Sequence, residues 1–229
     1  MHARPMTRFG WIGALLLTSV LLLTPSTASA VVFDFVAFVA AEGEQGYDNS
    51  DPFTMTVAGV TLTATAFDDG GAETDFHVYL DGLSGGLPAG MGVCQELDGD
   101  LQCVPSSDDN LSAGEELHLS FGPDPVTLST IWFRDCDHTL VFDCGDADDL
   151  PNPLGPFLEI AVDGGSFATY SLGSSLAPGL VGSSFSFRYS NEKYYISKLD
   201  VTTAVPEPAS LVLLGSGLLG LAAARRRRT

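Results

Sequence analysis

Basic side chains are scarce in this 229-residue chain, and their position matters more than their number. Of the ten Lys and Arg residues, only Arg134, Arg188, Lys193 and Lys198 lie within residues 31–207, which hold all 29 acidic residues. That stretch has a formal charge of −25. Because so many carboxylates repel phosphate, we expect no binding to nucleic acid.

Sequence features of an enzyme are also missing. Outside the first 30 residues the only histidines are His77, His118 and His138, and there is no GxSxG nucleophile motif. The glycine-rich segment 82–86 has no helix pattern after it, unlike a phosphate-binding loop. A glycosidase needs only two carboxylates, but 29 acidic residues make that criterion uninformative. We therefore expect no enzymatic activity.

The sequence has no sustained 3.6-residue apolar period between its two ends, which argues against a helical domain. Short apolar segments alternate instead with turn sequences such as 163–165, Asp-Gly-Gly. We predict strands over residues 31–40, 54–57, 61–67, 76–80, 115–121, 126–133, 157–162, 167–172, 185–189 and 194–201.

These strands predict one all-β domain over residues 31–204, an antiparallel β-sandwich of jelly-roll type. The chain is 45% hydrophobic, which is enough for a core and excludes a disordered acidic tail. Residues 84–114 are the most loop-like part. Trp132 follows Ile131 and is expected in the core, whereas the pair Tyr194-Tyr195 should place one ring outward if it lies in a strand.

Cysteine is limited to four residues in two close pairs, Cys94 with Cys103 and Cys136 with Cys144. In an exported chain this spacing favours two local disulfides. Zinc is the competing interpretation, but it prefers CxxC-like spacing and usually histidine, and neither pair has these.

Carboxylates gather around these cysteines. Hard oxygen ligands clustered in turns suit Ca²⁺, although no segment matches an EF-hand. The alternative is a solvated acidic surface. The predicted calcium ligands are Asp143, Asp146 and Asp148, followed by Asp108 and Asp109.

Acidic residues are absent from residues 1–30 and 208–229. Residues 1–30 contain Arg4 and Arg8, an apolar stretch and the small-x-small pattern of Ala28 and Ala30. This pattern predicts a secretory signal peptide. The alternative is an uncleaved N-terminal anchor.

Residues 205–229 form a second terminal segment. Pro206-Glu207-Pro208 precedes an apolar run that starts at Leu211, and the chain then continues with Arg225, Arg226, Arg227 and Arg228. Residues 205–224 are just long enough to span a bilayer as one helix, with the arginines on the cytoplasmic side. The prolines keep the preceding backbone extended and open to a protease.

Together these three parts resemble the PEP-CTERM sorting signal, which occurs in Gram-negative bacteria that make extracellular polysaccharide. The resemblance covers the C-terminal tail only. It implies an exosortase, a membrane cysteine protease or transpeptidase that cuts near Pro206, Glu207 and Pro208. A permanently anchored single-pass protein is the alternative.

We therefore expect a protein exported through the inner membrane, held transiently by its C-terminal helix and then delivered to the cell surface or extracellular matrix. Its expected role is structural or adhesive, within an envelope or biofilm built on exopolysaccharide. Two alternatives stay open: a calcium-dependent carbohydrate-binding module and a secreted polysaccharide hydrolase.

Overall fold

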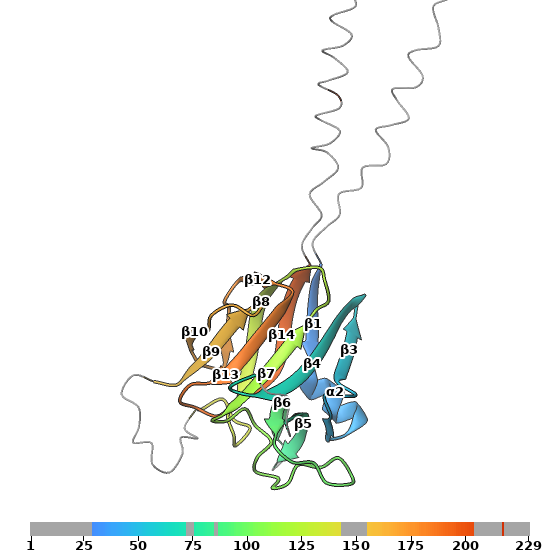
Figure 1. The fold of residues 1–229 in the computed structure, drawn as a ribbon, viewed down its shortest axis with the longest axis vertical. Helices are drawn as coiled ribbons and strands as arrows, with labels where there is room; N and C mark the ends of the chain where they lie inside the picture. The colour runs from blue at the N-terminus through green and yellow to red at the C-terminus, as the bar shows by residue number, and fades with distance from the viewer. Residues whose placement is uncertain (1–28, 72–75, 85–86, 143–154, 204–216, 218–229) are drawn as a thin grey trace, which may run out of the picture. The chain divides into compact units, whose positions relative to one another are not determined.

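Two antiparallel sheets form the folded part of the protein (Figure 1). The computed structural model describes residues 29–71, 76–84, 87–142, 155–203 and 217. Every strand pair in it is antiparallel, so the predicted all-β sandwich is confirmed.

Sheet A is the larger sheet. Its order is β11 (Ser175–Leu176), β8 (Val126–Arg134), β14 (Tyr195–Thr203), β6 (Leu87–Cys94), β5 (His77–Ser84) and β2 (Gln45–Tyr47). Two further strands complete it: β1 (Ala30–Asp34) pairs with β14, and β12 (Leu180–Gly182) pairs with β8.

Sheet B faces it. Its order is β10 (Ala168–Ser171), β9 (Phe157–Val162), β13 (Ser184–Tyr189), β7 (Glu115–Ser120), β4 (Val60–Asp68) and β3 (Phe53–Val57).

The core lies between the inward faces of the two sheets. In β4, Leu62, Ala64 and Ala66 are fully buried, while the threonines between them are partly or fully exposed. This is the period-2 pattern of a strand with one face in a core. Phe33 of sheet A also meets Phe121, at the end of β7, with ring centroids 5.8 Å apart. One hydrophobic core therefore joins both sheets.

The predicted strand over residues 31–40 is wrong in its second half, where the chain forms helix α2 (Phe35–Glu42). The Asp34 side chain accepts a hydrogen bond from Ala37 N at 2.9 Å and so caps the helix N-terminus. Gly43 ends it with φ 97°, a conformation that glycine adopts readily. The run is apolar on all sides, so its periodicity could not distinguish a buried helix from a buried strand.

The loop-like stretch 84–114 contains an unpredicted strand, β6, which pairs with β5 along most of its length. Two glycines of β6 are required because the backbone of other segments lies where a side chain would be. A Cβ on Gly92 would lie 2.1 Å from the carbonyl oxygen of Asp109, and one on Gly90 would lie 2.4 Å from that of Ile196. The glycines that made this stretch look like a loop are therefore packing positions in a sheet.

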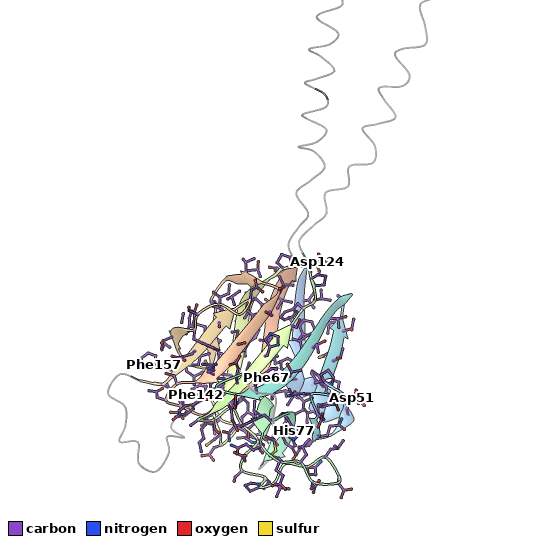
Figure 2. The ribbon with its side chains drawn as sticks, viewed as in Figure 1. Asp51, Phe67, His77, Asp124, Phe142 and Phe157 are labelled. Carbon is purple, nitrogen blue, oxygen red and sulfur yellow. A yellow bond between two sulfur atoms is a disulfide. The ribbon has the colours of Figure 1, made fainter. Side chains whose placement is uncertain are left out.

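The two ends of the domain in sequence meet at one end of the sandwich. Ala30 pairs with Thr202, and Thr203 pairs with Val126. Chain turns at residues 58–59, 122–125 and 163–165 lie at this end, which we call the tail-side end. Figure 2 shows Asp124 there, with His77 toward the opposite side.

The opposite end, the far end, is formed by the segments 95–114 and 135–142 together with the turn at 68–71. Segment 95–114 precedes β7, segment 135–142 follows β8 and the turn at 68–71 ends β4. All three lie at the strand ends that are most distant from Thr203.

Candidate functional site

The terminal processing residues adjoin the sandwich in sequence. Ala30, a predicted signal-cleavage residue, is the first residue of β1, and β14 continues to Thr203. Ala28 and the sorting residues lie outside the described residues, namely Pro206, Glu207, Pro208, Arg225, Arg226, Arg227 and Arg228.

The first cysteine pair is a disulfide that joins Cys94, the last residue of β6, to Cys103. Both sulfurs are buried beside Tyr79 and Leu97, in a small cluster of their own. Cys136 is also disulfide-bonded, and Cys144 lies outside the described residues. The disulfide at residues 94–103 therefore holds the far-end loop directly onto sheet A.

A buried ion pair fastens the far-end segment 135–142 to sheet A. His138 Nε2 lies 2.8 Å from Asp81 Oδ2, and both side chains are almost fully buried. The other ring nitrogen, Nδ1, lies 3.0 Å from the carbonyl oxygen of Leu87. Burial alone would lower the pKa of His138, but the Asp81 carboxylate and the Leu87 carbonyl raise it above its usual value.

The turn that presents His138 is fixed by a fully buried carboxylate, Asp135. Its oxygens accept from the backbone N of Thr139 at 2.5 Å and from Thr139 Oγ1 at 2.8 Å. His138 itself has φ 64°, a left-handed conformation in which a non-glycine residue is strained. Because both ring nitrogens of His138 already have protein partners, neither is open to a substrate. The contacts of His138 hold the turn against sheet A.

Tyr195 and Asp109 extend this buried group. The Tyr195 hydroxyl donates to Asp109 Oδ1, and the His138 ring meets the Tyr195 ring edge-on at 5.3 Å. Burial raises the pKa of Asp109 to about 6, with the Asp81 carboxylate adding to the rise. Burial and the Asp109 carboxylate likewise raise the pKa of Tyr195.

The prediction that one ring of the Tyr194-Tyr195 pair is exposed is therefore wrong, since both rings are buried. Tyr194 points into the core, where it contacts Phe133. Tyr195 points to the outer face of sheet A, but the segment around Asp109 and His138 covers it. Trp132 corrects a second expectation, because it is only half-buried and alternates with the buried Ile131 and Phe133.

Another buried carboxylate, Glu115, secures the end of the far-end loop. Its oxygens accept from Ser112 N at 2.6 Å and from Gln95 Nε2 at 3.4 Å, and the residue is fully buried. Burial raises its pKa to about 7, and the charge of Asp108 adds to the rise. Asp109 and Glu115, two carboxyl groups with raised pKa values, thus both hold loops in place.

The predicted calcium ligands are only partly described. Asp143, Asp146 and Asp148 lie outside the described residues. Asp108 and Asp109 are described, but the Asp109 carboxylate is engaged by Tyr195. Within residues 29–71, 76–84, 87–142 and 155–203, no group of three His, Cys, Asp or Glu side chains is arranged to hold a metal ion. Calcium binding stays a prediction from the sequence.

Sequence reasoning missed the residues that build this far-end group, namely Asp81, Asp135, Glu115 and the role of His138. The only signal was indirect: Asp81-Gly82 reads as a turn, and Asp135 and His138 flank a cysteine. Nothing in their spacing indicates that residues 81, 109, 138 and 195 meet, because each comes from a different part of the chain.

Comparison with protein families gives one match. Residues 204–228 match the PEP-CTERM protein-sorting motif. The recognition from Pro-Glu-Pro, the apolar run and the arginines is therefore confirmed, and the motif begins one residue after β14 ends. It marks an exported protein that an exosortase processes and sorts to the cell surface. Comparisons with curated proteins and with solved structures gave no match.

Within the described part of the chain, no helix is both long and apolar enough to cross a membrane. The predicted membrane-spanning segment lies almost wholly outside that part.

Proposed function

We propose that the mature β-sandwich is a structural or adhesive component of an extracellular polysaccharide matrix, delivered there by exosortase processing. The observation that carries the proposal is the sorting motif at residues 204–228, directly after the last strand of the folded domain. In this scheme the apolar run holds the precursor in the inner membrane until the cut near Glu207 releases or transfers the domain.

Three properties of the described domain support a structural role. A buried disulfide fits an oxidising extracellular compartment. The buried ionisable groups Asp81, Asp109 and Glu115 at the far end each contact a protein partner that fixes a loop. The high negative charge keeps the domain soluble and well hydrated outside the cell.

The processing step is tested by intact mass and by two matched variants. In the native host, surface-extracted protein should lack the residues after about Glu207. A Pro206→Ala/Glu207→Ala variant and an exosortase deletion should both leave the precursor uncut in the membrane. A Ser175→Ala/Pro178→Ala variant, with one change in β11 and one just after it, is the control and should be processed normally. A surface form that still carries Arg228 would contradict the proposal.

The matrix role is tested by sedimentation of the processed protein with exopolysaccharide purified from the same host. We expect the protein to sediment with the polymer, and the deletion strain to lose matrix cohesion. Release of new reducing ends from the polymer would favour the hydrolase alternative instead. Sedimentation only in the presence of Ca²⁺, abolished by EDTA, would favour the calcium-dependent binding module.

A further inference from the structure

Trp132 lies on the outer face of sheet A and takes no part in the core. Its neighbours along β8, Ile131 and Phe133, are fully buried, whereas Trp132 is partly exposed and belongs to neither hydrophobic cluster. Among the described residues its indole N–H has no hydrogen-bond partner and its ring meets no other aromatic ring. This large side chain therefore has a ring face and a donor that the fold does not use.

Polar side chains surround Trp132 on the same face of the sheet. Opposed residues of antiparallel strands share a face, so the register places Ser175 of β11 on one side of Trp132 and Lys198 of β14 on the other. Arg134 lies two residues further along β8, about 7 Å away, and Asp200 lies two residues beyond Lys198 along β14. We call these five residues the Trp132 face.

The Trp132 face is nearly neutral although the domain is strongly anionic. It contains Arg134 and Lys198, two of the four basic residues within residues 31–207. Lys198 Nζ lies 2.6 Å from Asp34 Oδ2, and Asp200 supplies the second negative charge. In the described part of the chain the Arg134 guanidinium forms no ion pair or hydrogen bond. The charge of −25 on residues 31–207 repels a polyanion, so this surface favours a neutral ligand.

We propose that the Trp132 face binds a neutral polysaccharide of pyranose units, with one sugar ring stacked on the indole of Trp132. The C–H bonds on one side of a pyranose ring meet the negative face of the aromatic ring, which is a favourable contact. Sugar hydroxyl groups accept from the indole N–H and from the Arg134 guanidinium, and they exchange hydrogen bonds with the Ser175 hydroxyl. This inference rests on the proposed function, for which it names the class of polymer and the residues in contact.

The experiment uses the processed protein extracted from the host surface. Trp132 is then the only tryptophan, because the other one, Trp11, lies in the predicted signal peptide. Acrylamide quenching of Trp132 fluorescence is measured with two neutral polymers, dextran and hydroxyethylcellulose, and with polygalacturonate as the acidic counterpart. Binding is measured independently by retardation of the protein in native gels that contain each polymer.

We expect a neutral polymer to reduce the quenching of Trp132 at least twofold and to retard the protein. Trp132→Ala should weaken the affinity measured by retardation at least tenfold. Leu140→Ala is the control, because it removes an apolar side chain that is 54% exposed at the far end, and it should bind like wild type. Unfolding transitions matched to the parent protein establish that both variants are folded, and the quenching measurement needs no substitution.

Unchanged quenching with both neutral polymers, or wild-type retardation of Trp132→Ala, overturns the proposed site. Protection of Trp132 by polygalacturonate alone overturns the assignment of a neutral ligand. The proposed function fails separately: if wild type does not sediment with the host exopolysaccharide while a neutral polymer still protects Trp132, the matrix role is overturned and the site stands. If Trp132→Ala sediments with that exopolysaccharide as well as wild type does, the site is overturned and the matrix role stands.

Discussion

The two ends of the sandwich differ in how their connections are held. At the tail-side end the connections are tight turns, such as Asp163-Gly164, with positive φ angles of 50° and 69°. At the far end, long segments lie over sheet A and are held by a disulfide, by the Asp81–His138 ion pair and by the buried Glu115. Local turn chemistry is sufficient at one end, whereas long-range polar contacts are needed at the other.

The largest expected loss of stability comes from adding one methyl group at Gly92, where β6 meets the far-end loop. Gly92→Ala places a Cβ 2.1 Å from the Asp109 carbonyl oxygen, so β6 and the far-end loop must separate. We expect a loss of about 3 kcal/mol in the free energy of unfolding, measured by urea denaturation. Gly99→Ala, in the far-end loop that follows β6, is the control, because a Cβ there meets nothing within 4 Å. Equal stability of the two variants would contradict the close packing of this loop.

The far end should also make stability depend on pH. The pKa of Glu115 is raised to about 7 and that of Asp109 to about 6, and the pKa of His138 is raised as well. The folded state therefore binds these protons more tightly than the unfolded chain. The resulting stabilisation is present at low pH and is lost as pH rises through the folded pKa values. We expect the domain to be more stable at pH 5 than at pH 8 by on the order of 3 kcal/mol.

Thermal unfolding at the two pH values measures this difference. Glu115→Gln should reduce it, because the amide oxygen can still accept from Ser112 N but no longer titrates. Glu159→Gln is the control, because Glu159 is a partly exposed residue of β9, and it should leave the pH dependence unchanged. Greater stability at pH 8 than at pH 5 would be incompatible with the buried carboxyl groups described above.

Removing the disulfide should loosen the far end alone. In the Cys94→Ala/Cys103→Ala variant the denatured chain regains the entropy of a nine-residue separation, which costs about 2–3 kcal/mol. Hydrogen exchange should then increase in residues 95–112 and stay unchanged in the turn at 163–165. Uniform acceleration of exchange at both ends would show that the two ends are not independent.

The smallest effect is expected at the tail-side end. Val181→Thr removes little buried surface, because the side chain is 60% exposed, and threonine suits a strand equally well. The free energy of unfolding should change by less than about 0.5 kcal/mol. A larger loss in urea denaturation would mean that this surface is held by contacts within the domain.

Local pattern was enough to predict much of the fold. The alternation of threonine with apolar residues in 61–67 predicted β4, because neighbouring residues of a strand face opposite sides. The turn at Asp163-Gly164-Gly165 was likewise predicted from residues that accept positive φ angles. Pattern failed at α2, where an apolar run fits two periods, and at β6, where glycines serve packing between strands.

The candidate functional residues also fall into two groups, those that local sequence reveals and those that only the fold brings together. The sequence alone determined the sorting signal, because Pro-Glu-Pro, the apolar run and the four arginines all lie within one short segment and are recognised without the fold. It also determined most of the strands, though not β6, and the excess of acidic residues. Only the tertiary structure decided that Asp81, His138 and Tyr195 meet, and that Asp109 joins them. Those properties depend on which strands become neighbours, and strand pairing brings together residues whose distance along the chain carries no information about their contact.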